Sequence, residues 1–487
     1  MWNKTVDLVV VGCGAAGASA AIGAHDKGAS VLVLEKMPVA GGSSRMCGGT
    51  IREILDVDEA TEYFAAVNDE TVSYALNRKF TEECKKNYDW FTNTLNATLI
   101  RATKVKWPPA PDVVWPFLPG TAGVGGRFLV SGEGHPENAS KPAGANLMAC
   151  LMDNIQKRKI EVLVNSPVKE LVTNDKREVL GVLAETPQGA LRVRAKKGVI
   201  LTCGGFMNNR EMMINYLGTM LKYQGNPGNT GDGIRMAQKL GAQLWHMLGV
   251  SCGIGYTIPG EDYVAGIGVR TSGYIYVDQF GKRFLDETGN DVHAMAHEFL
   301  HLDHQHKCYP RIPGWLIFDE NTRKAGRMLG HCPGIIQDSY VWSDDNMKEV
   351  ENGWLVMAYN IKELAEKTDI PPYILEETIG KYNIAACSGY DPDFGRNGYS
   401  MTPINTPPFY AAKVEPGMLN TQGGPVHNEH CQVIDVEGNV IRHLYASGEL
   451  GSIFHMHYPG GANISECLGM GRHAGEYIAE YETEVSE

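Results

Sequence analysis

The stretch from Val6 to Lys36 constrains the fold of this chain more than any other part of the sequence. It reads VDLVVVGCGAAGASAAIGAHDKGASVLVLEK: an apolar β-branched run, a glycine turn, a run of small residues, and a second apolar run that ends in an acid. Two strands joined by a helix within about thirty residues form a βαβ unit with parallel strands. The sequence therefore predicts an α/β fold built on a parallel sheet.

The glycines of this turn follow the dinucleotide-binding pattern. Gly12, Gly14 and Gly17 occupy the G-x-G-x-x-G positions, and Glu35 lies eighteen residues beyond Gly17. In this pattern the first glycine makes the tight turn, the second lets a pyrophosphate touch the backbone, and the third lets helix and strand pack closely. The helix N-terminus adds amide donors and the positive end of its dipole. We expect a dinucleotide here, with Glu35 on a ribose.

The loop after Glu35 distinguishes FAD from a nicotinamide dinucleotide. It reads EKMPVAGGSSRMCGGT over residues 35–50 and holds a second set of glycines. The ribityl chain and isoalloxazine of FAD continue past the pyrophosphate and must lie against bare backbone, which glycine allows. The residues expected to give this approach, and to donate near the flavin, are Gly41, Gly42, Gly48, Gly49, Ser43 and Ser44.

The chain of 487 residues is too long for one ordinary domain. Glycine turns followed by small-residue helices recur up to about residue 246 and return in the last eighty residues. The stretch between them is a mixture of aromatic, histidine and proline-rich sequence. We therefore predict a discontinuous sheet domain, residues 1–246 and 406–487, interrupted by an inserted domain, residues 247–405.

Composition narrows the partners and the compartment. Lys and Arg number 44 against 57 Asp and Glu, a formal charge of −13, which argues against nucleic acid or an anionic membrane as a partner. The eleven cysteines are scattered without a C-x-x-C pair, as in a reduced compartment. No stretch approaches eighteen apolar residues and the first residues show no signal peptide. We expect a cytoplasmic protein, and its oligomeric state is left open.

In their order, these motifs resemble the flavoprotein family of fumarate reductase and 3-ketosteroid dehydrogenase. The resemblance spans nearly the whole chain and is carried by GCGAAG with Glu35, AGGSS, TCGGF (202–206), GDG (231–233), YASGELG (445–451) and GGANISECLGMGRHAG (460–475). It implies a Rossmann-like FAD-binding domain, an inserted capping domain, and an active site between the two.

The resemblance also implies which residues hold FAD, noncovalently. Gly460 and Gly461 open a helix whose amides would face the flavin pyrimidine edge, where the helix dipole stabilises negative charge. Gly448 and Glu449 are similar to the family's ribityl-binding pair. The full implied set is Gly12, Gly14, Ala15, Ala16, Gly17, Glu35, Lys36, Gly41, Gly42, Ser43, Ser44, Cys47, Gly48, Gly49, Val168, Cys203, Gly204, Gly205, Asp232, Gly448, Glu449, Gly461, Asn463 and Ser465.

For the chemistry, the resemblance points to Arg270. The family's proton-donating arginine precedes a strand and a G-x-R-F turn, and GVRTSGYIYVDQFGKRFLDE (268–287) has that layout. Tyr458 would assist as an acid or base, its ionisation favoured by a nearby cation. Tyr274, His455 and His457 are the further candidates for the proton donor.

Two departures from fumarate reductase indicate the substrate. Asn420 stands where the family has a substrate histidine, and Tyr458 where it has an arginine, so a dicarboxylate would lack matched charge. A neutral planar polycyclic substrate is expected instead, first an isoflavonoid and alternatively a 3-ketosteroid. NAD(P)H, a partner protein or a second substrate molecule could each supply the electrons. Aromatic residues that could line a flat slot are Trp107, Trp115, Phe117, Tyr256, Tyr263 and Tyr274.

A function of another class is suggested by HEFLH at residues 297–301, which satisfies the H-E-x-x-H pattern of zinc peptidases. In such an enzyme Glu298 would be the general base, and zinc would need a third protein ligand. His293, His297 and His301 share one helix face at i, i+4 and i+8. Since the other motifs all serve FAD, we expect a solvated or subunit-facing histidine face and no metal site.

Overall fold

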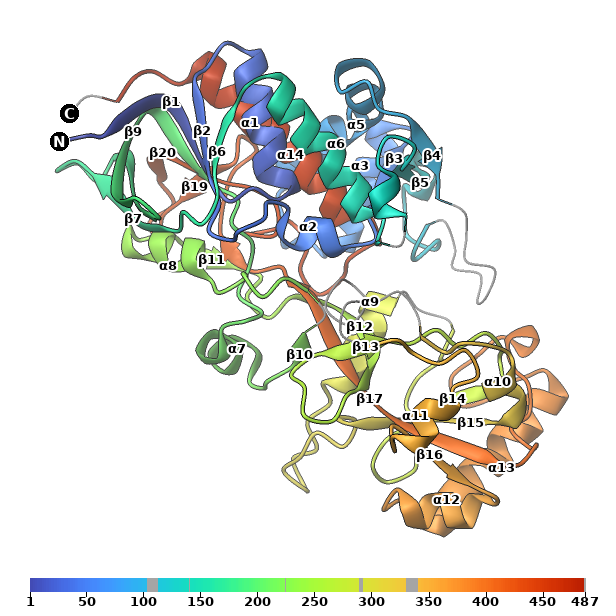
Figure 1. The fold of residues 1–487 in the computed structure, drawn as a ribbon. Coiled ribbons are helices and arrows are strands. Elements are labelled where there is room, and N and C mark those ends of the chain that lie inside the picture. The colour runs from blue at the N-terminus through green and yellow to red at the C-terminus, as the bar shows by residue number, and fades with distance from the viewer. Residues whose placement is uncertain (103–112, 140, 224, 289–291, 330–339, 486–487) are drawn as a thin grey trace.

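The computed structural model describes residues 1–102, 113–139, 141–223, 225–288, 292–329 and 340–485 (Figure 1). The predicted βαβ unit is formed by β1 (Lys4–Val11), α1 (Ala15–Asp26) and β2 (Val31–Leu34). The two strands pair in parallel, with Leu8 opposite Val31. The predicted α/β fold class is confirmed.

The first sheet has eight strands within the described residues, with the main order β19-β20-β9-β1-β2-β6 and with β8 and β7 joined to β9. Strands β20, β9, β1, β2 and β6 are parallel, so their carboxyl ends meet at one edge, where open α/β sheets bind ligands. The bounds of the other strands are β6 (Glu161–Leu163), β7 (Val168–Thr173), β8 (Val179–Thr186), β9 (Gly189–Leu201), β19 (Gln432–Ile434) and β20 (Val440–Ala446).

Helices α1, α14 (Ala462–Tyr481) and α6 (Gly144–Lys157) lie side by side next to this sheet (Figure 1). The small residues predicted for α1 are needed because α14 packs directly on its backbone. A Cβ added to Gly475 would lie 2.1 Å from Ala20 O, and one added to Gly471 would lie 2.6 Å from Ala16 O. Any larger residue at either glycine would push the two helices apart.

Shorter elements complete this part of the molecule. A three-stranded sheet joins β3 (Ile51–Ile54), β5 (Val124–Val130) and β4 (Leu99–Arg101). The remaining helices are α2 (Gly42–Met46), α3 (Val57–Val67), α4 (Tyr74–Lys85), α5 (Asn87–Asp89), α7 (Arg210–Leu217) and α8 (Asp232–Lys239), with short π and 3-10 turns at Trp90–Thr94, Thr121–Gly123 and Pro136–Asn138.

A second sheet follows the order β13-β12-β17-β15-β14, with β10 and β16 also paired to β17. Its central strand β17 (Phe409–Thr421) runs from the far end of this sheet toward the first (Figure 1). The others are β10 (Lys222–Tyr223), β12 (Val250–Thr257), β13 (Val264–Gly266), β14 (Tyr274–Val277), β15 (Gly314–Asp319) and β16 (Leu355–Ala358), and helices α9 (Val292–Phe299), α10 (Glu320–Lys324), α11 (Met347–Glu351), α12 (Ile361–Lys367), α13 (Pro372–Ser388) and a 3-10 turn (Gly398–Ser400) belong to the same region.

The predicted inserted domain, residues 247–405, contributes most of this second sheet, which also takes in β10 and β17 from outside that range. We call the region around the second sheet the cap; its exact boundary as a domain stays a prediction. The chain joins the two regions through β11 (Leu244–Trp245) and β18 (Gly424–Pro425), which pair antiparallel, and Gln422 N donates to Gly249 O at 2.9 Å. These two crossings therefore lie side by side.

Within the described part of the chain, none of the helices combines the length and apolar character that crossing a membrane requires.

Candidate active site

A cavity of about 480 Å³ opens at the carboxyl edge of the first sheet, between it and the cap. Its volume is within the usual range of small-molecule sites. One wall comes from the turn after β1, the loop that contains α2, and the start of α14. The cap contributes the opposite wall through Ser251, Gly253, Ile254, Gly266, Ile267, His293, Leu419 and Asn420.

The three glycines of the first turn have different neighbours. A Cβ on Gly12, whose φ is +99°, would lie 2.7 Å from Cys203 Cα, and one on Gly17 would lie 2.0 Å from Gly12 O. Gly14 lines the cavity, and a Cβ there would meet its nearest protein atom, Ser44 Oγ, at 3.5 Å. Protein packing thus explains Gly12 and Gly17, whereas Gly14 leaves room for a ligand at the α1 N-terminus.

Glu35 is 6% exposed at the end of β2 and lines the cavity. One carboxylate oxygen accepts from Cys13 N and the other from Met37 N, both at 2.8 Å. The backbone therefore fixes the carboxylate, and its remaining lone pairs can accept ribose hydroxyls.

A second acid, Glu449, lies in the cavity wall farther along and is partly buried. Asn229 Nδ2 donates to both of its carboxylate oxygens at 2.9 Å, and Thr421 N donates at 3.2 Å. Burial raises the pKa of Glu449 to about 7, against the lowering effect of these hydrogen bonds. A carboxyl group in this setting can accept from or donate to a ligand hydroxyl.

The start of α14 forms part of the cavity wall. Gly461, with φ of +89°, caps the helix, and Asn463 in its first turn lines the cavity. Asn463 Nδ2 donates to Gln422 Oε1 at 3.2 Å, whereas Asn463 Oδ1 and Gln422 Nε2 are buried without a hydrogen-bond partner among the described residues. The hydrogen bond between the two amides holds the Asn463 side chain in place at the start of α14.

These features fit FAD. The glycine turn and the α1 N-terminus suit its pyrophosphate, Glu35 its adenosine ribose, Glu449 its ribityl hydroxyls, and the amides at the start of α14 its pyrimidine edge.

Most of the predicted FAD-binding residues line the cavity, although their contact with the cofactor stays a prediction. Five lie behind the wall instead and shape it. Gly17 packs on Gly12, Gly448 on Ala16, and Ser465 Oγ accepts from Arg52 N at 2.8 Å and donates to Gly461 O at 3.0 Å. The other two are Gly41 and Gly205. Those lining the cavity are Gly12, Gly14, Ala15, Ala16, Glu35, Lys36, Gly42, Ser43, Ser44, Cys47, Gly48, Gly49, Val168, Cys203, Gly204, Asp232, Glu449, Gly461 and Asn463.

Of the predicted catalytic residues, Tyr458 and Asn420 line the cavity. Tyr458 Oη accepts from Gly461 N at 2.9 Å, and this bond holds the phenol at the α14 N-terminus. Asn420, near the end of β17, donates from Nδ2 to Thr421 O at 3.1 Å.

Arg270, His455 and His457 are not in the cavity wall. Arg270 is exposed, and its Nε donates to Arg327 O at 3.1 Å. His455 stacks on His246 with ring centroids 5.0 Å apart. His457 Nδ1 lies 3.3 Å from a carboxylate oxygen of Asp69. Their catalytic roles stay predictions.

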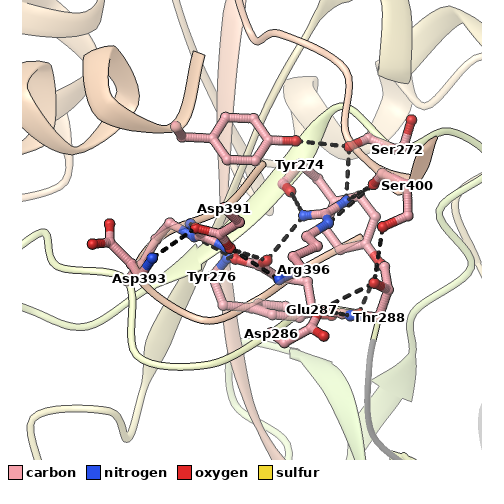
Figure 2. A network of polar contacts seen from close by, with 12 residues as sticks. Ser272, Tyr274, Tyr276, Asp286, Glu287, Thr288, Asp391, Asp393, Arg396 and Ser400 are labelled. Carbon is pink, nitrogen blue, oxygen red and sulfur yellow. Dashed lines mark hydrogen bonds and ion pairs between the residues drawn. The ribbon is translucent and has the colours of Figure 1, made fainter. Parts of the chain in front are cut away.

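Tyr274 belongs to a polar network in the core of the cap (Figure 2). Its hydroxyl donates to Glu287 O at 3.3 Å, and burial raises its pKa. Arg396, which is fully buried, pairs with Glu287 at 2.9 Å, and Arg283 pairs with Glu287 at 2.8 Å and with Asp391 at 3.0 Å. The G-x-R-F turn thus supplies Arg283 to a structural network, away from the cavity.

The predicted aromatic slot is not formed. None of the described candidates lines the cavity, and Trp107 lies outside the described residues. Trp115 packs against His457, Tyr263 against Tyr223, and Phe117 is 80% exposed. Tyr256 lies in the hydrophobic core of the cap.

The HEFLH helix is α9, and its histidines have separate surroundings. His293 lines the cavity, His297 Nε2 lies 3.2 Å from Val250 O, and His301 is exposed beyond the end of the helix. Glu298 is paired with Arg311 at 3.3 Å. No group of three or more potential ligands is placed to hold a metal ion in the described part of the chain.

Sequence reasoning missed several residues of the wall. Asn229, which holds Glu449, lies two residues before the motif GDG (231–233), and this nearness is a signal that could have found it. Ser251 and Arg127 carry no sequence signal, because each lies in a strand without a motif. The sequence marks His293 only as part of a possible metal-binding face.

Comparisons with known proteins agree with this geometry. The model of the FAD binding domain family matches residues 7–464. The 3-oxosteroid 1-dehydrogenase of Mycolicibacterium smegmatis is 30% identical over 97% of this chain and 96% of its own length. The NADH:fumarate oxidoreductase of Klebsiella pneumoniae is 30% identical over 98% of this chain, which spans only 48% of that protein.

The fold is shared with 3-ketosteroid delta1-dehydrogenase from Sterolibacterium denitrificans. That structure matches with a TM-score of 0.85 and 22% identity, covering 98% of this chain and 100% of the other. The predicted resemblance to fumarate reductase and 3-ketosteroid dehydrogenase flavoproteins is confirmed. The chain belongs to the FAD binding domain family and is an FAD-dependent oxidoreductase.

Proposed function

We propose that this oxidoreductase acts on a neutral, flat, polycyclic substrate. The observation that carries the proposal is that Tyr458 and Asn420, which replace the charged anchors of a dicarboxylate, both line the cavity. A small dianion placed there would lose its hydration without gaining matched cations from these positions.

The cap side of the cavity supports a flat ring system. Gly253 and Gly266 have no side chains, and Ile254, Ile267 and Leu419 are aliphatic. Such a wall offers apolar surface to an aromatic or alicyclic ring, while a few polar groups orient it.

Within this class we propose an isoflavonoid, with tetrahydrodaidzein reduced to equol as the specific reaction. This reaction removes a benzylic hydroxyl group, so it needs a hydride for the carbon and a proton for the departing oxygen. A hydroxyl donor such as Tyr458 beside an apolar wall suits both the phenolic rings and the departing group.

A 3-ketosteroid is the second candidate, because a relative that spans nearly the whole chain is a 3-oxosteroid dehydrogenase. Here Tyr458 would polarise the ring carbonyl. The electron donor could be NAD(P)H, a partner protein or a second substrate molecule.

FAD, when bound, supplies the hydride that passes between its N5 and a substrate carbon. The chain itself binds the substrate against the cap wall and excludes water. Gly461 N donates to Tyr458 Oη at 2.9 Å, so the phenol is held at the start of α14, where it can orient a substrate oxygen.

The test is anaerobic reoxidation of the dithionite-reduced holoenzyme, followed by flavin absorbance. Tetrahydrodaidzein, 1,4-androstadiene-3,17-dione and fumarate would each be offered to the parent and to the double variant Asn420→His with Tyr458→Arg. We expect a ring substrate to reoxidise the parent fastest. Fumarate should reoxidise the double variant faster than it reoxidises the parent. Fumarate reacting with the parent as fast as either ring compound would overturn the proposal.

A further inference from the structure

His293 brings a titratable side chain to the cap wall of the cavity, where no motif placed one. It stands in the first turn of α9, and its Nδ1 lies 2.8 Å from Ser251 Oγ on β12. Ser251 is 1% exposed and also lines the cavity. This hydrogen bond with a buried hydroxyl fixes the orientation of the imidazole ring.

The same imidazole packs against Tyr458. The two ring centroids are 4.8 Å apart at an interplanar angle of 63°. Tyr458 comes from the loop before α14 and His293 from the cap, so the pair forms where the two regions face each other across the cavity.

We propose that His293 exchanges the proton of the reaction with the substrate, while Tyr458 orients the substrate oxygen. This inference rests on the proposed function. In the reducing direction the substrate carbon gains a hydride, which is two electrons and one proton together, from reduced FAD. The substrate gains one further proton from the His293 imidazolium. With a benzylic alcohol, the C–O bond breaks, a C–H bond forms, and the oxygen leaves as water with that proton.

The choice of His293 follows from position and chemistry together. An imidazole ordinarily titrates near neutrality, whereas a guanidinium holds its proton to above pH 12, so a histidine is the better acid. Arg270 also lies outside the cavity wall and bonds to Arg327 O. Ser251 on β12 and Tyr458 before α14 face His293. His297, farther along α9, interacts electrostatically with His293, His455 and His457.

The test uses the FAD-loaded full chain and the ring compound that reoxidises the parent. In His293→Ala, FAD content and the spectral change on binding that compound should match the parent. Its single-turnover reoxidation should fall about 10²- to 10⁴-fold. Added imidazole should restore much of the rate, since it can occupy the space left by the side chain. His301→Ala, an exposed histidine near the same helix, is the matched control and should react like the parent.

Two further variants make the outcomes distinct. Ser251→Ala should lower the reoxidation rate less than His293→Ala does, and it should shift the pH profile of that rate. The reason is that this change removes only the hydrogen bond that orients the His293 imidazole. If His293→Ala reacts at the parental rate while Arg270→Lys loses about a hundredfold, the proton belongs to Arg270 and the inference is wrong. A slow His293→Ala that imidazole does not restore would mark a structural role and also overturn it. If no ring compound reoxidises the parent, the proposed function fails and the inference falls with it.

Discussion

Gly12, Gly14 and Gly17 share one turn, yet only Gly14 has no close protein neighbour to exclude a side chain. Gly12 and Gly17 would each place a Cβ within 3 Å of backbone atoms, whereas a Cβ on Gly14 would meet ordinary contact distances. Gly14 also has an extended backbone, with φ of −82°, which any residue can adopt. A side chain at this position therefore conflicts with the ligand and not with the fold.

We predict that Gly14→Val gives a folded but colourless protein. The isopropyl group would occupy the space that a pyrophosphate needs at the start of α1. FAD content after release by denaturation, and the circular dichroism of the variant, would be measured against the parent. Gly380→Val, at a helix position with no atom near its Cβ site, is the control and should stay yellow. A yellow Gly14→Val protein with parental FAD content would contradict the assignment of this turn.

At the residue level the sequence predicted the FAD side of the cavity better than the catalytic side. Gly14, Glu35 and Glu449 belong to local patterns whose spacing fixes their place in the fold. Arg270 belongs to a pattern too, but its side chain is turned onto Gly326 and Arg327, more than fifty residues away. Long-range contacts of this kind leave no trace in a single sequence.

Helix α14 shows how one element combines packing with electrostatics. Its glycines let it pack on α1, and its buried Glu466 holds the loop before it. Ser452 Oγ donates to the Glu466 carboxylate at 2.6 Å and Ile453 N donates at 2.9 Å. Burial nevertheless raises the pKa of Glu466 from its ordinary value of 4.5 to about 8.

We predict that Glu466→Gln makes the stability of the protein less dependent on pH. The folded state keeps a proton on Glu466 that the unfolded state loses above pH 4.5. The parent therefore loses stability as the pH rises from 4.5 to about 8. The glutamine side chain does not titrate, so the melting temperature of the variant should rise relative to that of the parent as the pH increases across this window. Thermal melts of both proteins from about pH 5 to about pH 8 would measure the difference.

The control is Glu437→Gln, which changes an exposed glutamate in a turn and should follow the parent at every pH. Parallel curves for Glu466→Gln and the parent would show that burial does not hold a proton on this residue.

Helix α9 marks a limit of prediction at the level of elements. The H-E-x-x-H spacing predicts a helix, and α9 forms but ends at Phe299, before His301. The same letters fit a zinc site and a helix packed on β12 equally well. The choice depends on the partners, which are Ser251 for His293 and Arg311 for Glu298. Both come from other elements.

For the whole molecule, the class of fold followed from the sequence, because a βαβ unit with a glycine turn allows few alternatives. The membership of the second sheet did not. Strand β17 lies beyond the predicted inserted region, yet it is the centre of the cap sheet. Its pairing with β12, β15 and β16 depends on partners up to about 170 residues away.

We predict that the purified protein contains about one FAD per chain and no stoichiometric zinc. The glycine turn, Glu35 and Glu449 suit a dinucleotide, whereas Glu298 is paired with Arg311 and His297 with a backbone carbonyl. Flavin analysis and metal analysis of one preparation would measure both. One zinc per chain, together with peptidase activity that Glu298→Gln abolishes, would contradict this expectation.

The side-by-side crossings at β11 and β18 attach the cap to the first region at one end, so the cap can rotate about that end as a hinge. Strand β10 also joins the cap sheet near the same end of β17, at Gly417 and Met418, so the joints gather close to the cavity. Helices α12 and α13 lie at the far, free end (Figure 1). A small rotation at the joint is therefore amplified with distance, and a label on α13 would travel farther than one on α9 for the same widening of the entrance.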